Sequence, residues 1–129
     1  MPTSSSADAG GLLAVLSDEH RQIRDMARDF AQNRLAPYSV EWEEEAAIPR
    51  SVLTEMGGLG LMGMTVPESY GGAAADYVSY ALALMEIAGG DGAVSTVMSV
   101  NNSPCCAALL QEGTEAQKQA FLTQLAEGE

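Results

Sequence analysis

The sequence predicts an all-α domain, built as an up-and-down or orthogonal bundle of four to five helices. Three observations support this prediction. Apolar residues recur at helical spacing through most of the chain. Prolines and glycines stand mostly between these periodic segments rather than inside them. With 129 residues, of which 47% are hydrophobic, the chain is long enough to bury one core.

The first two predicted helices have recognisable start and stop residues. Ser17 can cap the first helix, and Ala36–Pro37 ends it because the residue before proline avoids helical geometry. Pro49 opens the second helix, where a missing amide donor costs nothing, and Gly57–Gly58 ends it. Between the two helices, the acidic run Glu41–Glu45 predicts a solvated turn or loop. The apolar faces comprise Ile23, Ala27, Phe30 and Ala31 in the first helix and Val52, Leu53 and Met56 in the second.

A glycine-punctuated apolar stretch, residues 59–72, has no helical period and predicts a tightly packed connector. The third helix, from about Asp76 to Ala88, is apolar around nearly its whole circumference. Such a helix must be central, or be covered by something outside this chain. This apolar surface also predicts self-association.

The last two predicted helices follow a second glycine pair. Asp91 can cap the fourth helix, which Pro104 should kink and Gly113 should end. Thr114 begins a capping-box sequence for the fifth helix. The predicted inner face of that helix comprises Phe121, Leu122 and Leu125.

Charge and composition exclude several classes of function. The formal net charge is −12, which repels nucleic acid and anionic membranes. No apolar run reaches membrane-spanning length. Residues 1–11 lack the features of a signal or transit peptide. Residues 1–15 are expected to form a disordered tail, with residues 16–129 as the folded domain. The protein is expected to be cytoplasmic.

Few residues of this chain have the chemistry of an active site. Cys105 and Cys106 are adjacent, so they cannot form a disulfide that joins distant parts of the fold, and they are interpreted as small core residues. His20 lies among charged residues, which favours a surface role. Glu86 is a carboxylate in an apolar helix, and could be a tuned base or a structural ion-pair partner of Arg24 or Arg28; we favour the ion pair. With a single histidine and no spaced cysteines, no zinc site is expected.

The order of several short motifs resembles the N-terminal helical domain of the acyl-CoA dehydrogenase family. The most informative is the connector Leu59-Gly60-Leu61-Met62-Gly63, followed by Val66-Pro67-Glu68-x-Tyr70-Gly71-Gly72. Its flanks agree in order along the chain. They are Leu16-Ser17-Asp18-Glu19 with Arg21, then Ile48-Pro49, Glu86-Ile87-Ala88, Gly113-Thr114-Glu115-x-Gln117-Lys118 and Leu125-Ala126-Glu127-Gly128-Glu129.

This resemblance implies an oxidoreductase that converts an acyl-CoA thioester to a trans-2-enoyl-CoA with FAD. In the family, a β-rich middle domain and a second helical domain follow, and they carry most FAD contacts and the catalytic glutamate. Neither domain is expected within these 129 residues, so no residue is assigned a catalytic role. The chain alone is expected to bind no cofactor and to be inactive. Its expected partners are acyl-CoA, the remaining domains and, since relatives are commonly dimers or tetramers, further copies of itself.

The resemblance also implies a substrate-binding role for the fourth helix, which lines the acyl chain in relatives. The matching positions are Ser95, Thr96 and Ser99, with Val97, Met98, Val100 and Ser103 nearby. The alternative is that these small residues simply allow close helix packing. At the level of the whole chain, the alternative is a stand-alone acidic helical module that binds an acyl chain or a partner protein without catalysis.

Overall fold

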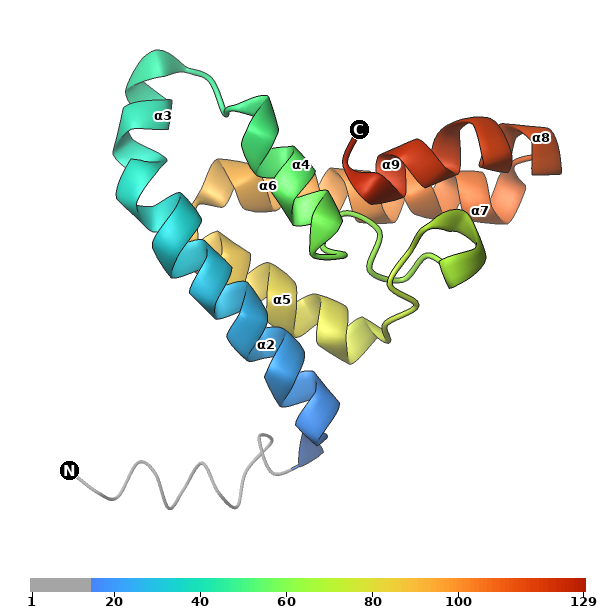
Figure 1. Cartoon of the computed structure of the whole chain (residues 1–129), viewed down its shortest axis with the longest axis horizontal. Coiled ribbons are helices and arrows are strands. Elements are labelled where there is room, and N and C mark those ends of the chain that lie inside the picture. Colours follow the sequence, from blue (N-terminus) through green and yellow to red (C-terminus); the bar gives the residue numbers. More distant parts are fainter. Residues whose placement is uncertain (1–14) are drawn as a thin grey trace.

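The computed structural model describes residues 15–129, which fold into an all-α bundle (Figure 1). Within that range the chain forms five helical rods and no strand. The expected tail, residues 1–15, lies outside the described residues except for Val15. The separate helical elements are α2 (Asp18–Phe30), α3 (Ser39–Glu45), α4 (Arg50–Gly58), α5 (Tyr77–Gly90), α6 (Gly92–Val100), α7 (Ala108–Glu112), α8 (Glu115–Gln117) and α9 (Thr123–Glu127).

The first rod is longer than the sequence predicts. The Ser17 hydroxyl accepts a hydrogen bond from the His20 amide, which confirms the predicted cap of α2. Beyond α2 the path continues through a π-helical segment, Ala31–Leu35, and a 3₁₀ turn, Ala36–Tyr38, into α3. Proline stands in the first turn of that 3₁₀ segment, where its missing amide costs little, so it does not end the rod.

The prediction of a solvated turn at Glu41–Glu45 is therefore wrong. These residues belong to α3, which is anchored by one aromatic side chain rather than by an apolar stripe. Trp42 is buried and stacks on Tyr38, with 5.8 Å between ring centroids. The carboxylates cover the exposed sides of the helix, and Ala46 ends it in the left-handed conformation.

The main core lies where α2, α4, α5 and α6 meet the connector. α2 packs along α5, which in turn packs on α6. The predicted inner faces of the first two helices are confirmed: Ala27, Phe30, Ala31, Val52 and Met56 are buried, while Ile23 and Leu53 pack against them partly buried. The connector adds Leu61, Met62 and Met64 to the same core, as its apolar composition predicts.

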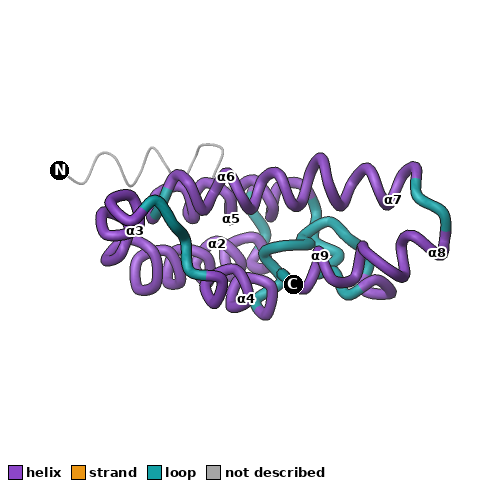
Figure 2. The backbone as a smooth tube through the Cα atoms, turned by 90° about the horizontal axis from the view of Figure 1, so that it is seen from above, coloured by secondary structure: helices purple, strands orange, loops and turns teal. Residues whose placement is uncertain are grey.

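The C-terminal rod turns back along α7, so that the chain end lies beside α4 (Figures 1 and 2). The Thr114 capping box is present as predicted. α4 and α9 approach so closely that a Cβ on Gly57 would collide with the backbone carbonyl of Glu127. Glycine at this position therefore sets the spacing between the two helices.

The inner face of this rod differs from the prediction. Leu122 is buried and Leu125 packs partly buried beside it, but Phe121 is 56% exposed and Ala126 is buried in addition. Phe121 lies within a π-helical segment, Lys118–Leu122. At about 100° per residue, Leu122, Leu125 and Ala126 share one face and Phe121 lies beside it. A comparable segment, Asn101–Ala107, contains Pro104 and joins α6 to α7 in one rod. The irregularity predicted at Pro104 takes this form.

Candidate functional site

A groove between α5 and α6 gathers most of the residues that the sequence singles out. It is open to solvent and has a volume of about 390 Å³. Its α6 wall comprises Ser95, Thr96, Ser99 and Val100, and its α5 wall comprises Leu84, Met85 and Ala88. The three α5 residues were not named from the sequence as site residues. Their signal was present, however, because a helix that is apolar all round must present an apolar surface to something beyond its own core.

The other three predicted positions lie elsewhere on the same rod. Met98 is fully buried in the main core, and Val97 packs partly buried against that core. Ser103 is exposed in the π-helical segment beyond α6. These residues do not line the groove.

The groove surface is less polar than its serines and threonine suggest. The Ser95 hydroxyl donates to the Gly92 carbonyl at 2.7 Å, and the Thr96 hydroxyl donates to the same oxygen at 3.1 Å. Both protons are therefore directed to the backbone of α6. At the edges, Met85 is 67% exposed and Val100 is 48% exposed, so large apolar side chains flank the opening.

Both ends of α6 are held by side chains. At its start, the Asp91 carboxylate accepts from the Val94 amide at 2.8 Å and from the Ser39 hydroxyl at 2.6 Å. This confirms the predicted cap. At its end, Asn102 is buried and joins α6 to the connector: it accepts from the Met64 amide at 2.7 Å and donates to the Leu61 carbonyl at 2.9 Å.

The neighbouring Asn101 makes a second connection. Its amide donates to the Met62 carbonyl at 2.7 Å and to the Leu125 carbonyl at 2.9 Å. The two asparagines together tie one end of α6 to the connector and to α9. The sequence shows only a polar stretch here, so this pair of clamps was not predicted.

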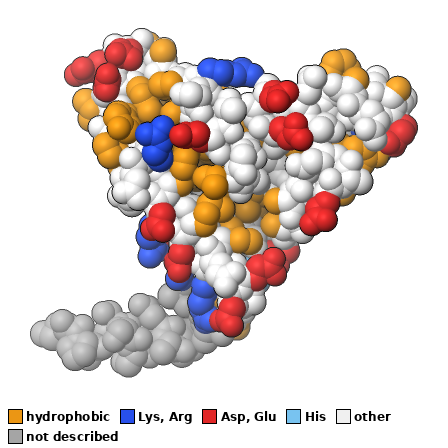
Figure 3. Space-filling view, viewed as in Figure 1, with side chains coloured by type: hydrophobic (Ala, Val, Ile, Leu, Met, Phe, Trp, Pro, Cys, Tyr) orange, Lys and Arg blue, Asp and Glu red, His pale blue; other side chains and the backbone are white. Residues whose placement is uncertain are grey.

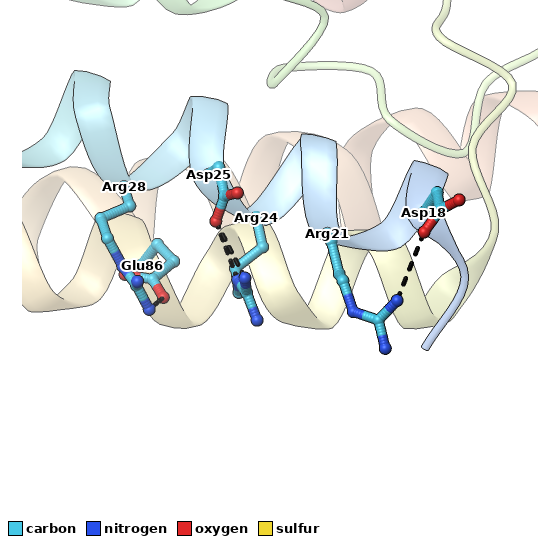
Figure 4. Close-up of polar contacts among 6 residues, drawn as sticks. All are labelled: Asp18, Arg21, Arg24, Asp25, Arg28 and Glu86. Carbon is cyan, nitrogen blue, oxygen red and sulfur yellow. Dashed lines mark hydrogen bonds and ion pairs between the residues drawn. The ribbon is translucent and has the colours of Figure 1, made fainter. Parts of the chain in front are cut away.

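Glu86 is held in an ion pair rather than placed as a base. Arg28 of α2 donates to both of its oxygens, at 2.8 Å and 3.2 Å (Figure 4). This interaction raises the pKa of Arg28 above its usual value. The predicted ion pair is confirmed with Arg28, whereas Arg24 pairs with its neighbour Asp25.

His20 also has a structural role. Its Nδ1 accepts from the Ser17 amide, and its Nε2 contacts the Asp76 carboxylate at 2.7 Å. Asp76 in turn caps α5 by accepting from the Ser79 amide. The histidine thus links the starts of α2 and α5, and this hydrogen bonding lowers the pKa of Asp76 to about 2.

The two cysteines have different environments, which corrects their interpretation as a pair of core residues. Cys106 is buried, and burial raises its pKa to about 11. Cys105 is exposed. Neighbours in a helix point in directions about 100° apart, and here that places Cys106 toward the core and Cys105 toward solvent.

A larger hollow, of about 560 Å³, lies where α3 meets the start of α6. Its buried carboxylate, Asp91, is already occupied as a helix cap, so we do not assign it a binding role. Across residues 15–129, no three His, Cys, Asp or Glu side chains are grouped to hold a metal ion. In the same range, no helix has the length and apolar character that crossing a membrane requires.

The surface is predominantly acidic with apolar patches. On the face in Figure 3, carboxylates are spread around the edge and apolar side chains gather between them. α5 contributes exposed Tyr77, Val78 and Met85. The exposed apolar surface predicted for the third helix is thus present in the isolated chain.

Comparison with known proteins agrees with this architecture. Residues 17–129 match the family model described as "Acyl-CoA dehydrogenase, N-terminal domain". The human mitochondrial short-chain specific acyl-CoA dehydrogenase is 40% identical over 114 residues, which cover 88% of this chain and 28% of that protein. The chain thus spans little more than a quarter of the length of this relative.

Two solved structures of glutaryl-CoA dehydrogenase from Mycobacterium smegmatis have the same fold. One is 38% identical, with a TM-score of 0.85 over 92% of this chain and 30% of that chain. The other, a complex with FADH2, is 35% identical, with a TM-score of 0.86 over 91% of this chain and 30% of that chain. The chain therefore belongs to the acyl-CoA dehydrogenase N-terminal domain family.

Proposed function

We propose that this chain forms one wall of the acyl-binding site of a flavin-dependent acyl-CoA dehydrogenase, which converts an acyl-CoA thioester to a trans-2-enoyl-CoA. The observation that carries the proposal is the α5–α6 groove. Four of the seven positions expected to contact an acyl chain line it together: Ser95, Thr96, Ser99 and Val100.

The groove has the properties that an acyl chain needs. Two of its three hydroxyls, those of Ser95 and Thr96, turn back to the helix, so methylene groups meet mostly carbon atoms. Each methylene removed from water contributes about 0.8 kcal/mol. The clamps at both ends of α6 hold the wall in place before a ligand arrives, which reduces the entropy lost on binding.

Two features of the described residues support the placement of FAD in other domains. A helix start can bind a pyrophosphate through its free amides, but the first turn of α6 is already capped by Asp91. The glycine-rich turn before it follows a helix rather than a strand. We therefore propose that other domains hold FAD and the catalytic base, and that residues 1–129 alone do not oxidise acyl-CoA.

The exposed apolar side chains of α5 support a further part of the proposal. Tyr77 is 76% exposed and Met85 is 67% exposed. Such surface is unfavourable in water unless it is covered. We propose that it is covered by the remaining domains or by another copy of the chain in a homo-oligomer.

A domain replacement tests the proposed function. Residues 16–129 would replace the matching segment of the human short-chain relative, and the chimera would be assayed for bound flavin and for oxidation of butyryl-CoA. We expect flavin binding and turnover. A Ser99→Trp substitution should fill the groove and lower kcat/KM at least about tenfold, the scale on which a poorly fitting pocket discriminates.

The matched control is Ala116→Trp, which places the same bulk on exposed α8, away from the groove. This variant should retain the kcat/KM of the chimera. A flavin-loaded chimera without turnover would contradict the proposal. So would a Ser99→Trp variant that is as active as the control.

A further inference from the structure

We infer that the α5–α6 groove selects acyl chains with an uncharged end and rejects chains that end in a carboxylate. This inference rests on the proposed function, since it concerns which acyl group the same groove receives. The similarity to known proteins leaves the question open. At 40% and 38% identity, the chain is close both to a short-chain acyl-CoA dehydrogenase and to a glutaryl-CoA dehydrogenase. A glutaryl group carries a terminal carboxylate and a simple short acyl chain does not.

The distribution of basic residues is the first argument. The whole chain has six lysines and arginines, and none lies between Arg50 and Lys118. Both walls of the groove belong to this stretch, and all seven lining residues are uncharged. A carboxylate on this wall would find no cation from the chain to balance it.

Most of the basic residues are engaged with carboxylates of the chain. Four of them lie on the first rod, and each makes an ion pair with a carboxylate: Arg21, Arg24, Arg28 and Arg34. Arg28 binds Glu86, the neighbour of the groove residue Met85 on α5. Both oxygens of Glu86 already share its guanidinium, so this cation is committed to a partner.

Hydrogen-bond donors are the second argument. A buried carboxylate without a cation needs several donors to compensate for lost water. Two of the three hydroxyls on the wall, those of Ser95 and Thr96, donate to the Gly92 carbonyl. The Ser99 hydroxyl alone cannot replace the hydration of a carboxylate.

The groove instead offers contacts to carbon. Leu84, Met85 and Val100 surround it, and the last two are largely exposed in the isolated chain. A terminal methyl group would cover part of this surface and leave no polar atom without a partner.

The test uses glutaryl-CoA dehydrogenase from M. smegmatis as host, with residues 16–129 in place of its matching segment. Glutaryl-CoA and pentanoyl-CoA are compared, because they have the same chain length and differ in the terminal group. We expect the ratio of kcat/KM for glutaryl-CoA over pentanoyl-CoA to fall at least about tenfold relative to the host. Bound flavin is measured in every preparation.

A charge placed in the groove should reverse the preference. Ser99→Arg should raise the glutaryl to pentanoyl ratio of the chimera several-fold, while Ser99→Met, of similar length but uncharged, should not. The dissociation constants of glutaryl-CoA and pentanoyl-CoA are also measured for the same Ser99 variants of the 129-residue chain. The preference for one thioester is then known without relying on flavin loading.

The outcomes separate the two claims. A chimera that keeps the ratio of the host, or a Ser99→Met variant that raises it as much as Ser99→Arg, would overturn the inference and leave the proposed function standing. A flavin-loaded chimera that oxidises neither thioester would overturn the proposed function, and the inference with it.

Discussion

Removing the Asn102 side chain should destabilise the domain strongly, although it makes no contact with solvent. Asn102 is 2% exposed and makes three hydrogen bonds, with the Met64 amide and with the carbonyls of Leu61 and Met98. In Asn102→Ala, the Met98 carbonyl keeps a backbone donor. The Met64 amide and the Leu61 carbonyl lose the partner that Asn102 provides.

The magnitude follows from these two groups. Each buried polar group left without a partner costs about 1–3 kcal/mol, so the loss is about 2–6 kcal/mol. Domains of this size have a total stability of about 5–15 kcal/mol. The variant should therefore unfold at least about 6 °C below the original chain.

The assay is thermal and urea unfolding of the 129-residue chain, followed by circular dichroism at 222 nm. Asn102→Asp keeps the acceptor for Met64 but turns an oxygen toward the Leu61 carbonyl, so it should be at least as destabilising at pH 7. The exposed neighbour Ser103→Ala is the control, with an expected change within about 0.5 kcal/mol. An Asn102→Ala variant as stable as this control would refute the reasoning.

Three further predictions concern other parts of the chain. Gly57→Ala should destabilise the domain strongly because its Cβ would meet the backbone of the last rod. The control Gly58→Ala has open space around it and should be neutral or stabilising by up to about 1 kcal/mol. Equal urea midpoints for the two variants would contradict this prediction. The pKa of Asp76 is lowered to about 2, so its stabilising effect is present above the unfolded value near 3.8 and is lost as pH falls through 2. Asp76→Asn should flatten the stability profile between pH 4 and pH 2, and an unchanged profile would count against it. A thiol reagent at pH 8 should modify Cys105 quickly and Cys106 only on unfolding, so Cys105→Ser should remove the fast phase; a fast phase that survives would disprove this.

Much of the fold could be predicted from the sequence because its local signals are strong. Ser17, Asp91 and Thr114 are short polar side chains at helix starts, and each caps the helix that it was expected to cap. The inner faces of α2 and α4 follow from helical spacing alone. The family resemblance, based on the connector and its flanks, is confirmed by the match over residues 17–129.

The errors arose where the helical period changes. Three π-helical segments interrupt the rods, and a fixed period of 3.6 residues places the side chains after them incorrectly. Phe121 lies within the last of these segments, beside the buried face rather than on it. The acidic run around Trp42 was taken for a turn because a single buried aromatic residue leaves no periodic signal.

The groove could be predicted only on one side. Its α6 wall follows from the family resemblance, but Met85 and the other α5 residues depend on how two helices pack. The Asn101 and Asn102 clamps were missed because their partners are backbone atoms far away in sequence. Backbone partners leave no trace in the pattern of residue types.

The Asn101 and Asn102 side chains separate the structural contacts of the rod that contains α6 from its groove-lining contacts. One end of α6 is fastened to the connector and to the last rod by Asn101 and Asn102, while Ser95 and Ser99 face the groove and bond to neither of those segments. Substitutions that reshape the ligand-facing side can therefore accumulate without loosening the scaffold. Proteins that contain this domain can therefore change their acyl-chain preference through single substitutions in the groove.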